Sequence, residues 1–266
     1  MHIGIVGFGV VGRALCRMIE GAGSHRIAIY DKYVTPYSSP DQLRAVNNCD
    51  LVFVAVPTPF DPVKNACDVS ILREVVELVS APLCIKSTVP PGTTDLLRRE
   101  TGKKICFSPE YLGEASGHPW AEAYSCGFVI LSGAQDVCTL TRQVYESAPP
   151  IPLQIVETDT TTAELAKYME NCFLAMKVAF VNQFFDLATA AGSDFQELRR
   201  LFLLDDRVGA SHTEVTAEHG FGGKCLPKDI SAIVAWAKGR ADTQLLEAVA
   251  RYKNSLCSDV SNGLGG

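Results

Sequence analysis

The chain begins with a short apolar run, His2–Val6, that leads directly into the glycine-rich segment GFGVVG at residues 7–12. The residues that follow have the periodicity of a helix. In such a segment Gly7 permits a tight turn, Gly9 lets a pyrophosphate approach the backbone, and Gly12 allows the helix to pack closely on the strand. This strand–turn–helix pattern limits the possible folds more than any other feature, because it is typical of a dinucleotide-binding α/β unit.

Asp31 extends this pattern. It follows a second apolar run, Arg26–Tyr30, about 20 residues beyond the glycines, where a carboxylate can bind both ribose hydroxyls of NAD and repel the 2′-phosphate of NADP. The adjacent Lys32 weakens that exclusion slightly. We therefore expect NAD as the cofactor, the alternative being a glycine-rich turn in an unrelated α/β protein. The residues of this unit that we expect to bind NAD are Gly7, Gly9, Val10, Val11, Gly12 and Asp31.

Short apolar runs alternate with helical patterns throughout the first half of the chain. The predicted strands are His2–Val6, Arg26–Tyr30, Leu51–Val56, Leu83–Ser87, Lys104–Phe107, Phe128–Leu131 and Leu153–Val156. The predicted helices are Val11–Glu20, Val69–Val79, Thr94–Glu100 and Asp136–Ser147. Strands that alternate with helices pair in parallel and are covered by helices, so we predict an α/β fold with a Rossmann-like, doubly wound parallel sheet.

The second half of the chain shows helical patterns alone. The stretch from Asp159 to about Ala191 contains no proline and predicts one long central helix. Asp159, Thr160 or Thr161 could cap its N-terminus, and Gly192 could end it. Shorter helices are predicted at Phe195–Leu204, Ile230–Lys238 and Thr243–Cys257. We expect an NAD-binding domain at residues 1–158 and an all-helical domain at residues 159–266.

Composition narrows the class of protein. The net charge of −6 argues against a nucleic-acid binder, and no apolar run reaches the ~18–20 residues that cross a bilayer. The N-terminus lacks the basic region of a secretory signal. The ten cysteines include no CxxC pair, which argues against a structural zinc site. We expect a cytoplasmic protein with no membrane or nucleic-acid partner and no bound metal, in which most thiols are small buried side chains.

Three segments follow predicted strands at the edge where doubly wound sheets bind their ligands. They are VPTP at residues 56–59, KSTVPP at 86–91 and SPEYLGE at 108–114. Taken alone, the prolines of the first two are most simply strand stops. The third contains Glu110 and Glu114, and two acids in a loop are usually solvated.

Two polar residues, Lys167 and Asn171, interrupt the largely apolar central helix. They lie four residues apart and therefore share a face. If they are buried they need partners, and they could supply paired donors to a developing oxyanion. The alternative is a solvated helix face.

The segment GFGGKCLPKD at residues 220–229 surrounds Cys225 with glycines, a lysine and the start of a helix. A thiol near a helix N-terminus and close to a lysine gains thiolate character, which is how proteins activate a nucleophilic cysteine. A structural cysteine would not need such an open loop. We therefore predict that Cys225 is a nucleophile.

Several of these segments occur in a familiar order. The set GFGVVG, PTP, KSTVPPGTT, SPEYLGE, ELAKYMENCFLAMK, DDRVGASH and GFGGKCLPKD resembles the UDP-glucose/GDP-mannose dehydrogenase family, from Met1 to about Lys253. The resemblance implies oxidation of the primary alcohol of a nucleotide sugar to a carboxylate with two molecules of NAD. It implies that Cys225 captures the aldehyde as a thiohemiacetal, and that Lys167 and Asn171 stabilise the oxyanions.

The resemblance also implies roles for the loop residues. By position, Asp229 and Thr88 order the water for base chemistry and hydrolysis, Glu110 assists hydrolysis of the thioester, and Glu114 lies near the nicotinamide and the substrate. The residues of these loops that we expect to contact NAD are Pro57, Thr58, Thr88 and Glu114.

Family members continue into a second Rossmann-like domain that holds much of the substrate's nucleotide. The chain is therefore expected to be a short form that lacks this UDP-binding domain and turns over nucleotide sugars weakly or not at all. One alternative is a non-catalytic NAD-binding protein. Another is a two-electron hydroxyacid dehydrogenase in which Lys167 is the acid–base and Cys225 is structural. The resemblance further implies a homodimer formed through the central helices.

Overall fold

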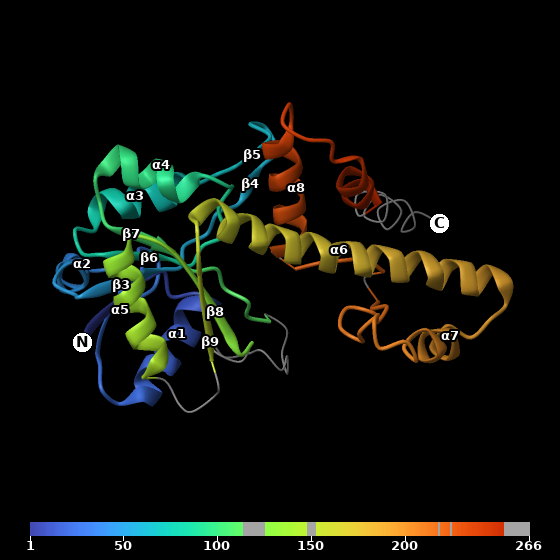
Figure 1. Cartoon of the computed structure of the whole chain (residues 1–266), viewed down its shortest axis with the longest axis horizontal. Helices are drawn as coiled ribbons and strands as arrows, with labels where there is room; N and C mark the ends of the chain where they lie inside the picture. The colour runs from blue at the N-terminus through green and yellow to red at the C-terminus, as the bar shows by residue number, and fades with distance from the viewer. Residues whose placement is uncertain (114–125, 148–152, 218, 224, 253–266) are drawn as a thin grey trace. The chain divides into compact units, whose positions relative to one another are not determined.

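The computed structural model describes residues 1–113, 126–147, 153–217, 219–223 and 225–252 (Figure 1). The chain divides into two compact units. The first contains Met1–Pro59 and Cys67–Lys167, and the second contains Phe60–Ala66 and Tyr168–Gly266.

A seven-stranded sheet forms the centre of the first unit. Its spatial order is β2 (Arg26–Tyr30), β1 (His2–Val6), β3 (Leu51–Val54), β6 (Leu83–Ile85), β7 (Ile105–Phe107), β8 (Phe128–Gly133) and β9 (Gln154–Thr158). Neighbouring strands are parallel except β7 and β8, in which Cys106 lies opposite Gly133. Antiparallel strands need no crossover helix, and no helix was predicted between these two. The predicted α/β class is confirmed, with one antiparallel pair in a mostly parallel sheet.

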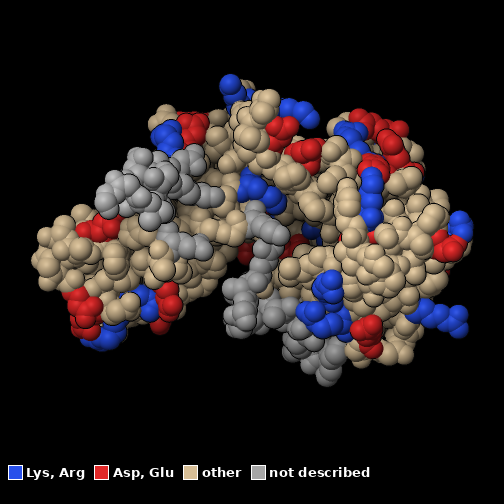
Figure 2. Space-filling view, turned by 180° about the vertical axis from the view of Figure 1, so that it is seen from behind, with Lys and Arg blue, Asp and Glu red and all other residues tan. Residues whose placement is uncertain are grey.

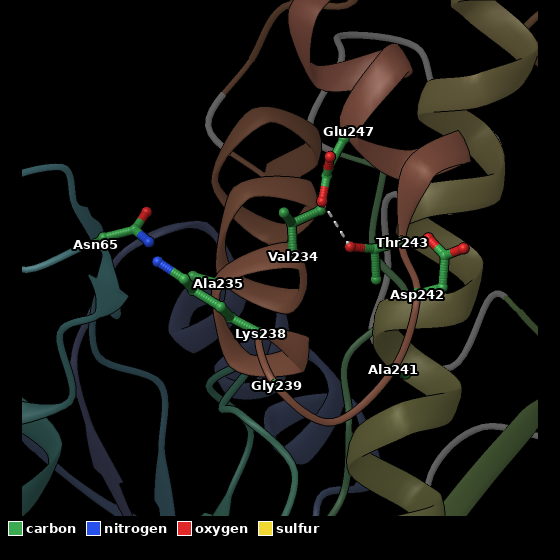
Figure 3. A pocket seen from close by; sticks show the side chains of 9 residues that line it. All are labelled: Asn65, Val234, Ala235, Lys238, Gly239, Ala241, Asp242, Thr243 and Glu247. Atoms are coloured by element: carbon green, nitrogen blue, oxygen red, sulfur yellow. Dashed lines mark hydrogen bonds between the residues drawn. The ribbon is translucent and has the colours of Figure 1, made fainter.

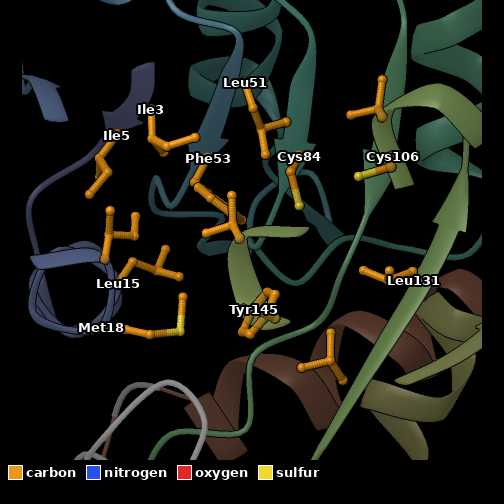
Figure 4. Close-up of a cluster of buried hydrophobic side chains, with 14 of the residues drawn as sticks. Ile3, Ile5, Leu15, Met18, Leu51, Phe53, Cys84, Cys106, Leu131 and Tyr145 are labelled. Atoms are coloured by element: carbon orange, nitrogen blue, oxygen red, sulfur yellow. The ribbon is translucent and has the colours of Figure 1, made fainter. Parts of the chain in front are cut away.

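The two faces of this sheet are covered by different helices. One core packs α1 (Val10–Ala22) and α5 (Gln135–Glu146) on the sheet, and part of it is drawn in Figure 4. The other packs α2 (Pro40–Asn47), α3 (Ser70–Leu78) and α4 (Thr93–Thr101). Strand β3 serves both, because Leu51 and Phe53 face the first core and Val52 and Val54 the second. Strands buried on both faces are continuously apolar, as the sequence of β3 is.

Three short elements were missed from the sequence. Helix α2 starts at Pro40 after Ser39, whose side chain accepts a hydrogen bond from the Gln42 N–H. This serine–proline pair is a helix-start signal that was present in the sequence. Strands β4 (Phe60–Asp61) and β5 (Ala66–Cys67) form a separate hairpin, each only two residues long. Strands this short leave no alternation to detect.

Helix α6 (Thr160–Ala191) is the predicted long helix, and it contains the limit between the units. The Asp159 carboxylate accepts a hydrogen bond from the Thr162 N–H at 2.8 Å and so caps its N-terminus. At its other end Gly192 has a φ of +66°, a left-handed conformation that favours glycine at a helix C-terminus. Both predicted ends are therefore confirmed to within one residue.

The second unit contains most of α6 together with α7 (Phe195–Phe202) and α8 (Cys225–Ala237). Helix α8 begins at Cys225 rather than at the predicted Ile230, because Pro227 lies in the first helical turn, where its missing N–H is not needed. Residues 244–252 are also helical, and the rest of the predicted helix to Cys257 lies outside the described residues.

Among the described residues, α6 alone is long and apolar enough to cross a membrane by length and composition. The core helix of a soluble protein meets the same criteria. This helix carries Glu164, Lys167 and Asn171 as buried polar side chains within the protein, which is the pattern of a packed helix.

Candidate active site

The glycine-rich loop between β1 and α1 has two positions where only glycine fits. Gly7 has a φ of +91°, and a Cβ there would lie 2.4 Å from the Ala55 carbonyl oxygen. A Cβ on Gly12 would lie 2.0 Å from the Gly7 carbonyl oxygen. Gly9 precedes α1, and a Cβ there would have no atom within 4 Å. At Gly7 and Gly12 the loop is therefore packed closely against other backbone atoms, whereas at Gly9, before the N-terminus of α1, it is open. This arrangement can accept a pyrophosphate.

The Asp31 carboxylate is fixed against this loop. Its Oδ2 accepts a hydrogen bond from the Phe8 N–H at 2.7 Å, and its Oδ1 accepts one from the Tyr33 N–H at 2.8 Å. An open backbone at Gly9 and an oriented carboxylate beside it fit the pyrophosphate and ribose of NAD.

The two proline-containing loops after β3 and β6 are joined to each other. The Thr58 hydroxyl donates to the Thr88 carbonyl oxygen at 2.7 Å. The Ser87 hydroxyl donates to the Val56 carbonyl oxygen at 2.7 Å and accepts from the Val56 N–H at 3.0 Å. These segments therefore do more than end their strands. They form one connected rim at the carboxyl edge of the sheet, with Pro57 exposed on it.

Lys86, at the end of β6, is a buried lysine that was not singled out from the sequence. It is 3% exposed. Its Nζ donates to the Tyr145 hydroxyl at 2.9 Å, and to the Ser108 Oγ and the Pro109 carbonyl oxygen at 3.2 Å each. It also lies 3.4 Å from Glu110 Oε2.

This cluster changes the interpretation of Glu110, whose side chain is only 9% exposed. The expectation of a solvated loop acid is wrong for this residue, because the chain turns it towards Lys86. Burial alone would lower the pKa of Lys86, but the Glu110 carboxylate and the Tyr145 hydroxyl raise it overall. Lys86 is thus charged at neutral pH. Glu114 lies outside the described residues.

Lys167 and Asn171 of α6 are 7% and 4% exposed, so the alternative of a solvated helix face is wrong for both. In the first unit, the Lys167 Nζ lies 4.3 Å from the centre of the Tyr111 ring, a cation–π distance. In the second unit, Asn171 Nδ2 donates to Asp229 Oδ2 at 2.6 Å.

Asp229 lies in the first turns of α8 and is completely buried. Besides Asn171 it pairs with Lys228 through its other oxygen. Cys225 is the first residue of the same helix and is half-buried. Because the two are four residues apart, the thiol and the carboxylate occupy the same face of α8. The second unit therefore brings together a helix-terminal thiol, a buried carboxylate and an amide donor.

Two cavities of the described residues lie apart from this site. In the second unit, a cavity of about 280 Å³ at the end of α8 is lined by residues that include Asn65, Lys238 and Glu247 (Figure 3). In the first, one of about 560 Å³ is lined by residues that include Arg98 and Lys104. Neither contains a predicted site residue. Within the described ranges, no group of three or more His, Cys, Asp or Glu side chains could hold a metal ion.

Two family models match the chain. Residues 37–147 match the NAD binding domain of the UDP-glucose/GDP-mannose dehydrogenase family, and residues 161–255 match its central domain. The chain belongs to this family. NAD is accordingly its cofactor.

Curated relatives and solved structures agree with this membership. The chain is 31% identical over 240 residues to the UDP-glucose 6-dehydrogenase of Rickettsia bellii, which covers 83% of this chain and 54% of the relative. It is 28% identical to UDP-glucose 6-dehydrogenase YwqF of Bacillus subtilis, over 84% of this chain and 53% of that protein. The chain thus spans about half the length of the curated relatives it matches.

The fold is shared with solved dehydrogenases. A UDP-glucose dehydrogenase from Pyrobaculum islandicum superposes with a TM-score of 0.79 at 23% identity, covering 96% of this chain and 68% of that one. The 3-hydroxyisobutyrate dehydrogenase of Mycobacterium tuberculosis superposes with a TM-score of 0.69 at 16% identity, covering 97% and 94%.

Proposed function

We propose that this chain is an NAD-dependent nucleotide-sugar 6-dehydrogenase, which oxidises the primary alcohol of a UDP-glucose-like substrate to the carboxylate. Its NAD-binding domain is residues 1–158 and its helical domain residues 159–266. The observation that carries the proposal is the position of Cys225, the first residue of α8, on the same face as the buried Asp229. A dehydrogenase that stopped at the aldehyde would need no such thiol.

The first unit supplies the cofactor site. The backbone at Gly9 receives the pyrophosphate, Asp31 binds the adenosine ribose, and the rim of Pro57, Thr58 and Thr88 contacts the rest of the cofactor. The other members of the proposed set are Gly7, Val10, Val11, Gly12 and Glu114. When bound, NAD accepts one hydride in each of the two oxidations.

The second unit supplies the nucleophile. The alcohol first loses a hydride, and its proton passes to the water molecule that Asp229 and Thr88 order. The Cys225 thiolate then adds to the aldehyde carbon, and the carbonyl oxygen becomes the oxyanion of a thiohemiacetal. Lys167 and Asn171 donate hydrogen bonds to this oxyanion. Loss of a second hydride converts the adduct into a thioester.

Hydrolysis completes the reaction. Asp229 and Thr88 order a water molecule whose oxygen attacks the thioester carbon, and the Cys225 thiolate leaves as the carboxylate forms. Glu110 assists this step by accepting a proton from the water. The ion pair with Lys86 supports this role, because it fixes the position of the carboxylate after β7.

A second candidate is a two-electron hydroxyacid dehydrogenase in which Lys167 is the acid–base and Cys225 is structural. The likeness to the 3-hydroxyisobutyrate dehydrogenase over 94% of that structure favours it, although at 16% identity this concerns the fold alone. The two candidates differ in the number of NADH molecules formed per substrate and in the need for the thiol.

We also propose a cytoplasmic homodimer formed through the central helices. Large apolar side chains of α6 are exposed, as a helix that binds a second copy requires. On the face drawn in Figure 2, basic and acidic side chains are interspersed over the described residues, which supports the expectation of no nucleic-acid partner.

The experiment is to incubate the protein with NAD and a panel of UDP- and GDP-sugars, and to count NADH per sugar consumed. The proposal predicts about two NADH per sugar for at least one member, and no complete oxidation by Cys225→Ser. One NADH per substrate, with full activity retained by Cys225→Ser, would favour the two-electron candidate. A protein that binds NAD but forms no NADH with any sugar would contradict the proposal and favour the alternative of a non-catalytic NAD-binding protein.

A further inference from the structure

The residue after Asp31 poses a problem for a site that selects NAD. Asp31 is held against the glycine loop by the Phe8 N–H, at the position that recognises the adenosine ribose. Lys32 follows it directly, and a basic side chain near this ribose is what accommodates the 2′-phosphate of NADP. Unless its charge is neutralised, Lys32 would attract the 2′-phosphate of NADP and so weaken the preference for NAD that Asp31 creates.

The neutralising charge comes from another element. The Lys32 Nζ lies 2.9 Å from Glu74 Oε1, on α3. The hydrogen bond and the negative charge of Glu74 raise the pKa of Lys32. The other cation beside the loop, Arg13, is also engaged, because its guanidinium lies 4.6 Å over the Phe8 ring.

We propose that Glu74 is a specificity-determining residue, which favours NAD over NADP by binding Lys32 and neutralising its charge. This inference rests on the NAD site proposed above. When Glu74 is paired with Lys32, the two side chains together contribute no net charge. The negative charge of Asp31 then decides which cofactor binds, because it repels a 2′-phosphate on the ribose. When Glu74 is neutral, the ammonium of Lys32 is released to attract a 2′-phosphate.

The pair suits mutation because both side chains are about half exposed, 54% for Lys32 and 48% for Glu74. Exposed ion pairs contribute little to stability, so Glu74→Gln and Lys32→Met should fold like the parent. A matched control lies next to it on α3. Arg73 forms a similarly exposed pair with Glu100, and Glu100→Gln breaks that pair without affecting Lys32.

The experiment measures the Kd of NADH and of NADPH by fluorescence titration for the parent, Glu74→Gln, Lys32→Met, the double variant and Glu100→Gln. In Glu74→Gln we expect NADPH to bind about fivefold more tightly, as for one released surface charge near a phosphate, with NADH within about twofold of the parent. The double variant should return to the parent's ratio of Kd values, and Glu100→Gln should not change it. High salt should reduce the effect of Glu74→Gln.

An unchanged ratio in Glu74→Gln, or the same change in the double variant, would overturn the inference while leaving the NAD site intact. A parent protein that fails to bind NADH would instead overturn the proposed function and, with it, this inference.

Discussion

The surroundings of each cysteine decide whether its thiol can react. Burial, together with a nearby carboxylate, raises the pKa of Cys16 and of Cys49 to about 11 and that of Cys172 to about 12. These thiols are protonated at neutral pH. A hydrogen bond from Cys106 lowers the pKa of Cys138, but that side chain is 2% exposed and beyond the reach of a reagent. Cys225 differs in being half-buried at the first position of a helix.

Cys225 should therefore be alkylated faster at pH 7 than any other cysteine of the chain, because access and a helix N-terminus both favour reaction as the thiolate. Brief treatment with iodoacetamide followed by peptide mapping measures this. Labelling in denaturant, where all ten thiols should react at similar rates, is the control. Labelling of Cys225 no faster than the others in the native protein would remove the support for a nucleophile.

The buried ion pair of Lys86 and Glu110 gives a second prediction. Lys86→Met should lower the free energy of unfolding by about 3–5 kcal/mol, because it leaves the Glu110 charge buried without its partner. The double variant Lys86→Met/Glu110→Gln should recover part of that loss. Urea unfolding followed by circular dichroism gives both values. A double variant whose loss equals the sum of the losses in Lys86→Met and in Glu110→Gln would show that the two residues do not interact.

Residue by residue, the sequence identified the parts of the site that depend on local pattern. Gly7, Gly9 and Gly12 could be predicted from the single segment GFGVVG, and Cys225 could be predicted from the segment GFGGKCLPKD that surrounds it. Lys86 was missed because its partners lie far along the chain, with Tyr145 59 residues away. One signal was available in the sequence, because Lys86 directly follows an apolar strand, and a lysine buried there needs a polar partner.

At the scale of elements, one contact attaches α4 to the first turns of α6. The Glu164 carboxylate accepts hydrogen bonds from the Gly92 N–H at 2.5 Å, the Thr94 N–H at 2.8 Å and the Thr94 hydroxyl at 2.6 Å. It thereby satisfies N–H groups at the start of α4, which lacks a cap from its own N-cap residue. A carboxylate from a helix remote in sequence performs this role.

This contact predicts a pH dependence. Burial raises the pKa of Glu164, and its hydrogen bonds oppose that rise only in part. Because the folded protein holds the proton more tightly than the unfolded chain, this group contributes most to stability below its ordinary pKa, and the contribution is lost as the pH rises through the raised value.

Glu164→Gln cannot titrate, so it isolates the effect. The stability of the parent relative to this variant should fall as the pH rises from 4 to 8. Urea unfolding at several pH values measures it. Glu197→Gln is the control, because Glu197 is exposed and its hydrogen bond with Arg200 lowers its pKa, so this residue should give no fall in stability with rising pH. A stability difference that rises with pH would show that the folded protein lowers the pKa of Glu164 instead of raising it.

Elements with a long periodic pattern were predicted well, and short or reversed ones were not. Helix α6 was predicted to within one residue because Asp159 and Gly192 mark its ends chemically. The predicted parallel direction is wrong for β8 beside β7, because a strand's own sequence does not record whether its neighbour runs parallel or antiparallel. The start of α8 was placed too late, since Pro227 was taken to precede the helix rather than to lie in its first turn.

At the scale of the whole molecule, α6 has a face of apolar side chains that is exposed to solvent in the single chain. Its exposed members in the second unit are Met169, Phe173, Phe180, Phe184 and Leu187. Successive members are three, four or seven residues apart, so they lie along one side of the helix. Exposed apolar stripes of this length are typical of helix-to-helix interfaces.

We therefore predict that the protein is a dimer in solution and that Phe173→Glu shifts it towards the monomer, because a charge would be buried at the interface. Light scattering across a range of concentrations measures the mass. Val63→Glu is the control, since Val63 is also an exposed apolar residue but lies between β4 and β5. A parent that is monomeric at high micromolar concentration would refute the dimer.

The central claim is that oxidation proceeds through a covalent bond to Cys225, and trapping that bond tests it most directly. Glu110→Gln should slow hydrolysis of the thioester more than its formation, so the acyl group should accumulate on the enzyme. The measurement is the mass of this variant after incubation with NAD and UDP-glucose and an acid quench, followed by peptide mapping. We predict a sugar-nucleotide acyl adduct on the Cys225 peptide, absent when Cys225→Ser is added. An unmodified Cys225, or an adduct on another peptide, would contradict the account.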